Sequence, residues 1–342
     1  MKRLTLVSFV FLLLFVVRVD GQFTYNVTDL GTLGGGSSRA YALNASGQVV
    51  GWANINSGEQ RAFLYANGVM NSLGNIDSGS YSGAYAINNN GQIVGYAQNS
   101  LGGNYAFLYS NSELKNVSPF PGSPSGAWGI NSSSQIVGDY NGHAFFISSS
   151  TEIQHLGTFG GSISYALGIN DNGSFVGGAF TSQNKEHAFL YSGGSMYDLG
   201  TLTVGGESRA RAINLNGDIV GQSDSRAFLY KNNSMIDIGS GSAEAINIYG
   251  DIVGVNGNSH AFIYKDGLIS DLNTLINPLS GWTLKEAFAI NDSGQIAGYG
   301  LNSLGQEHAF LLTPIGVPEP SIVFSTIGLS IFALYRTLRK SA

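Results

Sequence analysis

Short apolar runs and alternating apolar-polar runs recur seven times along the chain, and no helical periodicity is present between its two ends. Each copy has an alternating Ala-x-Ala-Ile-Asn segment, a polar turn, the segment Gln-Ile-Val-Gly, and then an apolar Ala-Phe-Leu-Tyr run. Runs of four to six such residues, bounded by Asn and Gly, are typical of β-strands. The copies are marked by the pairs that start at Leu43, Ile87, Ile130, Ile169, Ile213, Ile246 and Ile290.

Each copy predicts four strands. Asn-x-x-Gly between the first two suits a type I turn with a bulge. The Gly that closes the second strand indicates a bend or a close approach of two backbones. The Ala-Phe-Leu-Tyr strand is apolar enough to be buried on both faces, and a short turn then leads to a fourth strand such as Val69 to Leu73. Four strands in a repeat of typically 44 residues match a β-propeller blade, with an open solenoid as the alternative.

The two ends of the repeat region favour the propeller. The seventh copy has its first three strands, up to Leu312, and lacks the fourth. Phe23 to Gly31 reads as a fourth strand with no preceding three, and it matches Ser195 to Gly200. The N-terminal strand can therefore complete the last blade, which removes the exposed sheet edges. We predict an all-β, seven-bladed β-propeller closed in this way, with a hydrophobic anchor helix at the C-terminus.

The segments outside the repeats have the pattern of targeting signals. Residues 1–21 combine Lys2 and Arg3 with a short apolar run and small residues near Gly21, which predicts an export signal peptide. Residues 317–342 contain Pro318, Glu319 and Pro320, then the apolar stretch Ile322 to Tyr335, then a basic end. This tripartite tail resembles the PEP-CTERM sorting signal of exported proteins from Gram-negative bacteria. The resemblance implies two partners, the export machinery and an exosortase. It also implies a C-terminal helix that holds the protein in the membrane, at least transiently. The protein would then reach the cell surface or the exterior.

The repeats themselves resemble the HAF-repeat family of extracellular bacterial proteins, named for His-Ala-Phe. That motif begins at His143, His187, His260 and His308. Arg or Tyr takes the His place in three copies, and the resemblance covers nearly all of residues 23–313. It implies an extracellular repeat protein and no activity that could be carried over.

Composition limits the possible partners. Residues 22–316, the expected propeller, hold 10 Lys and Arg against 20 Asp and Glu, a formal charge of −10. This charge argues against nucleic acid, which needs basic patches. The chain has no cysteine, so its stability rests on its core and it has no thiolate chemistry. We expect a monomer.

The longer connections predict a binding face. Those between the second and third strands, and those between copies such as Asn75 to Gly83, lie on one side of a propeller, and function concentrates in loops on a rigid scaffold. Aromatic rings beside small polar groups stack on sugars and occur at protein interfaces. About half of these rings could equally pack between blades. The candidate ligand-binding residues on this face are Trp52, Tyr81, Tyr105, Phe120, Trp282, Arg39, Arg209 and Glu207.

The repeated polar motifs are better explained by structural roles than by metal binding or catalysis. The four His-Ala-Phe histidines could ligate a metal, but Arg occupies the same position elsewhere and is no usual ligand. Asn170 to Gly173 and Asn291 to Gly294 resemble calcium loops, yet most copies offer only Asn and Ser, which suit turns. We therefore expect no metal, no cofactor and no catalytic set.

Three hypotheses for function remain. The favoured one is a non-catalytic, surface-directed propeller that binds extracellular polysaccharide or a protein partner in the envelope or biofilm matrix. The first alternative is a hydrolase or lyase acting on glycans with carboxylates in the central channel. The second is a purely structural component of the matrix.

Overall fold

The computed structural model describes residues 24–119, 123–149 and 152–316. Within these ranges the regular elements are β-strands and two short 3-10 helices, η1 (Leu272–Thr274) and η2 (Pro278–Ser280). No helix in these ranges is long and apolar enough to span a bilayer. The predicted signal peptide, the Pro-Glu-Pro motif and the C-terminal anchor helix all lie outside the described residues.

The first four repeats each form one sheet of four antiparallel strands in chain order. These sheets are β2 (Gly34–Leu43), β3 (Val49–Ile55), β4 (Gln60–Ala66) and β5 (Val69–Gly74); β6 (Ser78–Ile87), β7 (Ile93–Asn99), β8 (Asn104–Ser110) and β9 (Glu113–Asn116); β10 (Ser125–Ile130), β11 (Ile136–Tyr140), β12 (His143–Ser149) and β13 (Glu152–His155); and β14 (Gly160–Ile169), β15 (Phe175–Thr181), β16 (Glu186–Ser192) and β17 (Ser195–Asp198).

The fifth and sixth repeats share one seven-stranded sheet. Its strands are β18 (Ser208–Ile213), β19 (Ile219–Ser223), β20 (Arg226–Lys231), β21 (Ser234–Ile246), β22 (Ile252–Asn256), β23 (Ala261–Lys265) and β24 (Leu268–Asp271). The first half of β21 pairs with β20 and the second half, from Gly241, pairs with β22. The two repeats are joined without a loop because only 33 residues separate Asn214 from Asn247, against 44 between Asn44 and Asn88.

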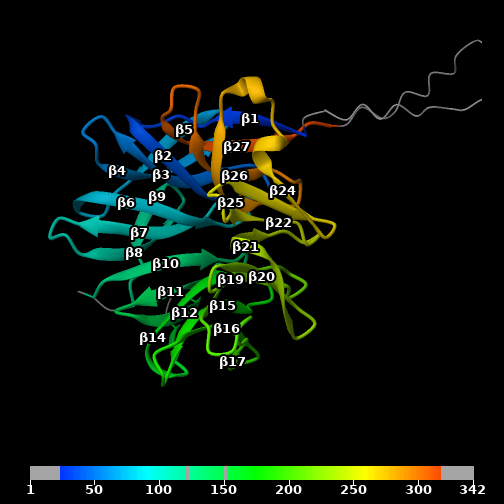
Figure 1. Ribbon diagram of the computed structural model, residues 1–342. Helices are drawn as coiled ribbons and strands as arrows, with labels where there is room; N and C mark the ends of the chain where they lie inside the picture. The colour runs from blue at the N-terminus through cyan, green and yellow to red at the C-terminus, as the bar shows by residue number, and fades with distance from the viewer. Residues whose placement is uncertain (1–23, 120–122, 150–151, 317–342) are drawn as a thin grey trace, which may run out of the picture.

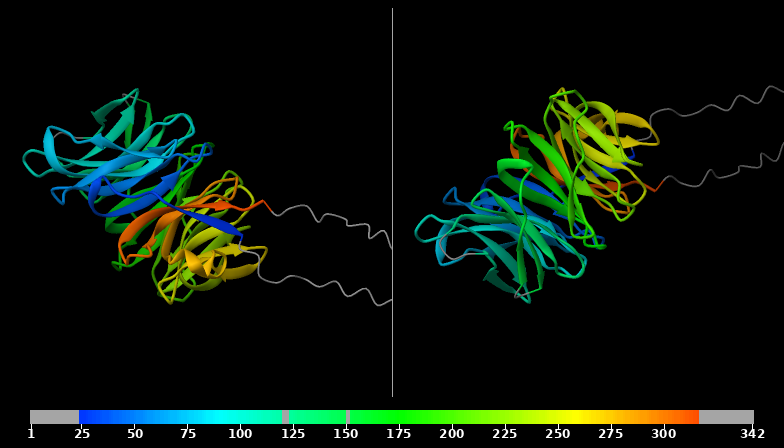
Figure 2. Two further views of the ribbon diagram at one scale, coloured as in Figure 1. Left: turned by 90° about the horizontal axis from the view of Figure 1, so that it is seen from above. Right: turned by 90° about the horizontal axis from the view of Figure 1, so that it is seen from below.

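The last sheet joins the two ends of the repeat region. It contains β25 (Thr283–Ile290), β26 (Ile296–Leu301), β27 (Glu307–Pro314) and, next to β27, the N-terminal β1 (Tyr25–Asp29). β1 and β27 are antiparallel, with Tyr25 opposite Pro314 and Asp29 opposite Phe310. In Figure 1 the colours run around the molecule from blue to orange, and the orange β27 lies beside the blue β1. The predicted pairing of the N-terminal strand into the last sheet is thus confirmed, and Figure 2 shows the same pair from above.

The cores lie between successive sheets. The phenylalanine of every Ala-Phe pair is fully buried: Phe63, Phe107, Phe145, Phe189, Phe228, Phe262 and Phe310. Each contributes about 2–3 kcal/mol by leaving water. The described residues form seven hydrophobic clusters, each drawing on two neighbouring repeats, and one combines Ala40 and Phe63 of the first repeat with Ala297 and Ala309 of the last. The alternating pattern therefore encodes contacts between repeats as well as strands.

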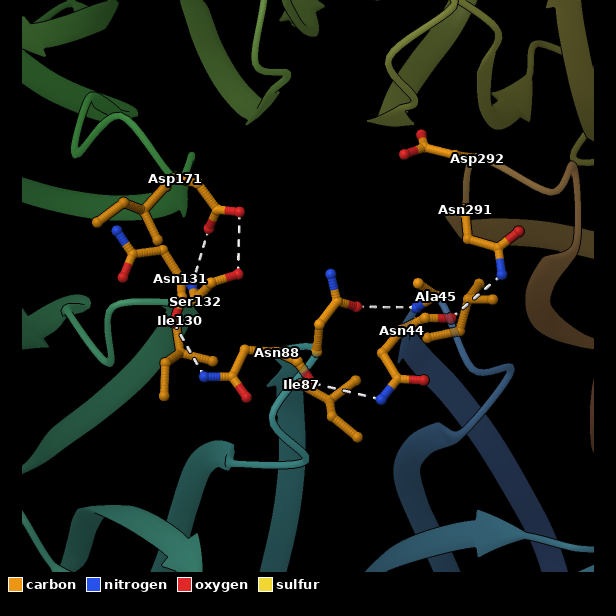
Figure 3. Close-up of a pocket in the computed structure, with 13 residues that line it drawn as sticks. Asn44, Ala45, Ile87, Asn88, Ile130, Asn131, Ser132, Asp171, Asn291 and Asp292 are labelled. Carbon is orange, nitrogen blue, oxygen red and sulfur yellow. Dashed lines mark hydrogen bonds between the residues drawn. The ribbon is translucent and has the colours of Figure 1, made fainter.

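The asparagine of every Ile-Asn or Leu-Asn pair is buried and closes a ring of hydrogen bonds. Its Oδ1 accepts from the backbone of its own turn, as Asn88 Oδ1 does from Asn90 N and Gln92 N. Its Nδ2 donates to the carbonyl oxygen of the same asparagine in the next repeat, from Asn44 through Asn291 and back to Asn44. Figure 3 shows part of this ring around the pocket at the end of the channel. The amide groups of these asparagines are therefore hydrogen-bonded to backbone groups and stabilise the scaffold.

One connection differs from its expected form. Asn75 to Gly83 was predicted as a loop, but β6 already begins at Ser78, which pairs with Asn99. Gly79 permits this because a Cβ there would lie 1.6 Å from the carbonyl oxygen of Gln98. A glycine in a polar, Ser-rich segment therefore marks a close strand pairing as well as a turn.

Candidate functional site

A β-bulge interrupts the innermost strand of every repeat. In the first repeat Ala40 pairs with Gly51 and Ala42 pairs with Val50, so that Tyr41 is the extra residue. The same shift occurs in the other six repeats. A bulge re-aims the side chain of its extra residue and commonly stands next to a functional site. The extra residues, which we call the bulge layer, are Tyr41, Tyr85, Trp128, Leu167, Arg211, Glu244 and Phe288.

The glycine that ends Gln-Ile-Val-Gly makes room for this bulge. A Cβ on Gly95 would lie 2.0 Å from the carbonyl oxygen of Gly83 and 2.9 Å from the ring of Phe107. Equivalent positions in the other repeats are as close, at 1.9–2.0 Å from a backbone oxygen. The predicted close backbone approach at this glycine is confirmed, and its purpose is to let the bulged strand lie against its neighbour.

The bulge layer lines one cavity of about 360 Å³ in the middle of the channel. Its aromatic side is contiguous: the Tyr41 and Tyr85 rings stack at 4.7 Å, and Trp128 meets Tyr85 edge-on at 4.8 Å. Phe288 meets Tyr41 edge-on at 4.9 Å from the other side. Burial raises the pKa of both tyrosines, so their hydroxyls stay neutral and can donate hydrogen bonds.

The opposite side of the cavity is charged. Arg211 Nε lies 3.4 Å from Glu244 Oε2, and Ser242 Oγ donates to Glu244 Oε1 at 2.5 Å. Among the described residues, Arg211 Nε is the buried side-chain atom left without a hydrogen-bond partner. The Glu244 carboxylate compensates this group as an ion pair, although the geometry of a hydrogen bond is not met. The cavity therefore combines an aromatic wall with a charged Arg–Glu pair.

Glu286, two residues before Phe288, adds a second carboxyl group to this side. Burial, and to a smaller extent the Glu244 carboxylate, raise its pKa to about 7 against the opposing effect of Arg211 and Arg39. At neutral pH this carboxyl group is therefore close to half protonated.

Glu286 makes stability depend on pH. In the unfolded chain its pKa is 4.5, against about 7 in the folded protein. Between these values the folded state keeps a proton that the unfolded chain has lost, so stability falls as the pH rises through this window. We expect this group to cost about 3 kcal/mol between pH 4.5 and 8. Urea unfolding should show Glu286→Gln gaining on the native protein over that range; parallel pH profiles would contradict the shift.

The ligand-binding residues predicted on the long connections do not form a single site. Arg39 and Trp52 lie together, with the guanidinium 5.9 Å from the Trp52 ring and 4.0 Å from that of Tyr299. Arg39 Nε also donates to Glu307 Oε1 at 2.8 Å. Trp52 Nε1 donates to the Tyr41 hydroxyl at 3.1 Å, which links this pair to the bulge layer.

Arg209 and Glu207 line a smaller cavity of about 180 Å³. Arg209 is held by Glu186 at 2.7 and 2.8 Å, whereas Glu207 lies 3.8 Å from Lys185. Glu186 begins β16 and Arg209 lies on β18, and Lys185 and Glu207 directly precede these strands, so the pairs contribute to the contact between the fourth and fifth repeats. The structure does not bring this group together with Arg39 and Trp52 in one pocket.

The other predicted aromatic residues are dispersed. Tyr81 is exposed, and Tyr105 lies on β8 opposite Ala97. Trp282 packs against the core between the last two repeats, 6.2 Å from the Phe310 ring, which is the packing role considered as the alternative. Phe120 lies outside the described residues.

Three of the four His-Ala-Phe histidines pair with aspartates of the outermost strands. His187, His260 and His308 lie 2.7–2.8 Å from Asp198, Asp271 and Asp29. Arg226 makes the same pair with Asp237, which explains why Arg substitutes for His. The last pair joins β27 to β1 and so supports ring closure.

The bulge layer was missed by sequence reasoning. Its signal is the variable residue inside Ala-x-Ala, which changes from Tyr to Trp, Leu, Arg, Glu and Phe while its neighbours repeat. Simple alternation does not mark it, because the bulge shifts the register at this residue.

Comparison with known proteins supports the architecture alone. No protein-family model and no curated protein matches the sequence. Among solved structures, YCF48 bound to D1 peptide has a TM-score of 0.54 at 10% identity and covers 87% of this chain and 97% of that one. The β-propeller domain of the trilobed protease from Pyrococcus furiosus has 0.51 at 10%, covering 88% and 98%. A puromycin-hydrolysing peptidase from Mycobacterium tuberculosis has 0.54 at 9%, covering 84% and 56%. At such identities the likeness shows a β-propeller fold and nothing of its ligands.

Proposed function

We propose that this chain is an exported, seven-bladed, non-catalytic β-propeller that binds extracellular polysaccharide in its channel. The count of seven is supported by the seven clusters between repeats and by the asparagine ring that returns to Asn44. It treats the two halves of β21 as belonging to two blades.

The observation that carries the proposal is the bulge layer. The side chains at these seven equivalent positions vary among the repeats, whereas the surrounding strands repeat. The chemistry of the bulge layer therefore determines which ligands the cavity can bind. Aromatic faces stack on the C–H faces of sugar rings, and the Arg211–Glu244 pair on the opposite side supplies charged groups that can hydrogen-bond to sugar hydroxyls. A cavity of about 360 Å³ is large enough for one pyranose ring with its substituents.

The export part of the proposal rests on the sequence of the two ends. Residues 1–21 have the pattern of a signal peptide, and Pro318, Glu319 and Pro320 head a tail that resembles a sorting signal. Mass spectrometry of the protein isolated from the cell exterior should find an N-terminus near residue 22. A full-length chain retained in the cytoplasm would contradict export.

The test of binding is a glycan array and a pull-down from matrix extract with the intact protein. We expect retention of polysaccharides, with millimolar to micromolar dissociation constants, and competition by the free oligosaccharide. Retention of a protein alone would instead identify a protein partner. No ligand of either kind would favour the structural alternative, for which matrix integrity should then fail in a deletion strain.

A specific observation also keeps the glycan hydrolase or lyase as a second candidate. Glu286, with its raised pKa, could donate a proton, and Glu244 lies against Arg211 and Ser242. Two carboxyl groups in different surroundings are the usual acid-base arrangement for glycoside cleavage. Incubation of the bound oligosaccharide with native protein should release no reducing ends under the binding proposal. Release that disappears in Glu286→Gln would establish the enzyme instead.

A further inference from the structure

A second cavity, of about 510 Å³, opens on the long-connection side of the second and third repeats. Tyr96 on β7 and Trp128 on β10 form its aromatic walls, with their rings 6.3 Å apart and tilted by 66°. Asp139 on β11 and the amide side chains of Asn104 and Asn141 supply its polar groups. Trp128 belongs to the bulge layer as well, so this cavity adjoins the channel.

Two glycines make room for the aromatic walls of this cavity. Two residues before the bulge position, the second and third repeats have Gly83 and Gly126, where the other five have Arg39, Tyr165, Arg209, Ser242 and Glu286. A Cβ on Gly126 would lie 2.4 Å from Trp128 Cζ2, and one on Gly83 would lie 3.1 Å from Tyr85 Cε2. The absence of side chains at these two positions lets the Tyr85 and Trp128 rings occupy the space that a side chain fills elsewhere.

The polar groups are placed at the edge of the indole. Trp128 Nε1 donates to Asp139 Oδ1 at 2.6 Å, so the carboxylate lies beside the ring and not above it. No described cation pairs with Asp139, and its second oxygen has no donor within the described part of the chain. Burial raises the pKa of this carboxyl group, partly offset by the Trp128 hydrogen bond.

We propose that this cavity is a subsite for a neutral pyranose residue of the polysaccharide, stacked on Trp128 with hydroxyls donating to Asp139. The inference rests on the proposed glycan-binding function and narrows its ligand. A sugar ring lying flat on the indole extends equatorial hydroxyls past the ring edge, where the Asp139 carboxylate stands, and Asn104 and Asn141 line the same cavity. The amides of Asn104 and Asn141 can both donate and accept, as hydroxyl recognition requires.

Charge and geometry disfavour the other ligand classes. An acidic sugar would bring a second carboxylate next to Asp139, with no described cation to compensate it. A cationic group centred over the indole would stand away from a carboxylate at the ring edge, so it could not use both groups fully. A neutral, flat and polyhydroxylated ligand satisfies all the groups at once.

The test uses calorimetric titration of the full chain with neutral and acidic oligosaccharides from the array. Gly126→Ala displaces the Trp128 ring, and Asp139→Asn keeps the acceptor for Trp128 Nε1 while removing the charge. We expect at least tenfold weaker binding of the neutral ligand for each. Gly36→Ala is the matched control, because no atom lies within 4 Å of its new Cβ, and it should bind normally. Thermal unfolding confirms that each variant is folded.

The outcomes separate the two proposals. Glycan binding that is unchanged in folded Gly126→Ala and Asp139→Asn would overturn the subsite and leave the propeller's glycan function standing. Preference of the native protein for acidic oligosaccharides would overturn the neutral ligand class. Absence of binding to every glycan would overturn both.

Discussion

Gly95→Ala is expected to lose about 3 kcal/mol or more of folding stability. The new Cβ would meet the Gly83 carbonyl oxygen at 2.0 Å and the Ala84 Cα at 3.0 Å, and neither is the flexible end of a side chain. Overpacking against backbone forces strand β7 away from the bulged strand β6 and from the buried Phe107 ring. The midpoint of urea unfolding should fall clearly, and the bulge layer should lose its geometry with it.

Gly36→Ala is the control for this substitution as well. Gly36 also lies in an innermost strand, β2, and its new Cβ would meet no atom within 4 Å. Its free energy of unfolding should stay within about 0.5 kcal/mol of that of the native protein. Equal midpoints for the two alanine variants would show that the glycine after Gln-Ile-Val has no steric role.

Removal of residues 24–30 is expected to open the molecule. The variant loses β1 with its pairing to β27, the Asp29–His308 pair, and the packing of Tyr25 and Val27 against the last core. β27 then becomes an exposed edge that pairs with other chains. We expect the melting temperature to fall by at least about 10 °C and the mass in solution to rise with concentration.

A peptide of residues 22–31 provides the control for that deletion. Added in excess, it can pair with the open edge of β27 and should restore much of the lost stability. If the shortened chain is monomeric and melts at the native temperature, then closure by β1 is not what holds the two ends of the repeat region together.

The fold could be predicted because its determinants are local and repeated. Alternation and turn residues mark the strands, and the unpaired fourth strand before Gly31 could be matched by sequence to the incomplete last repeat. The shared strand β21 was not predicted, because a connection shortened to Ser240 between two glycines still looks like a turn in sequence.

The candidate site was predicted less well because its contacts join distant repeats. Arg39 was predicted to bind a ligand, but its guanidinium is held by Glu307, which lies 268 residues further along the chain. Trp282 looked like a loop aromatic and packs on Phe310. The bulge positions were passed over, because a register shift of one residue follows from backbone pairing and leaves no mark in the hydrophobic pattern.

The central claim is that the bulge layer selects the ligand, whereas the repeated residues form the scaffold. Substitution of bulge residues by leucine tests this claim most directly. Leu167 occupies this position in the fourth repeat, so the scaffold accepts leucine there. The double variant Tyr85→Leu, Trp128→Leu should keep a melting temperature within a few degrees of native and bind the polysaccharide at least tenfold more weakly in calorimetric titration. Native affinity in the folded double variant would contradict the claim.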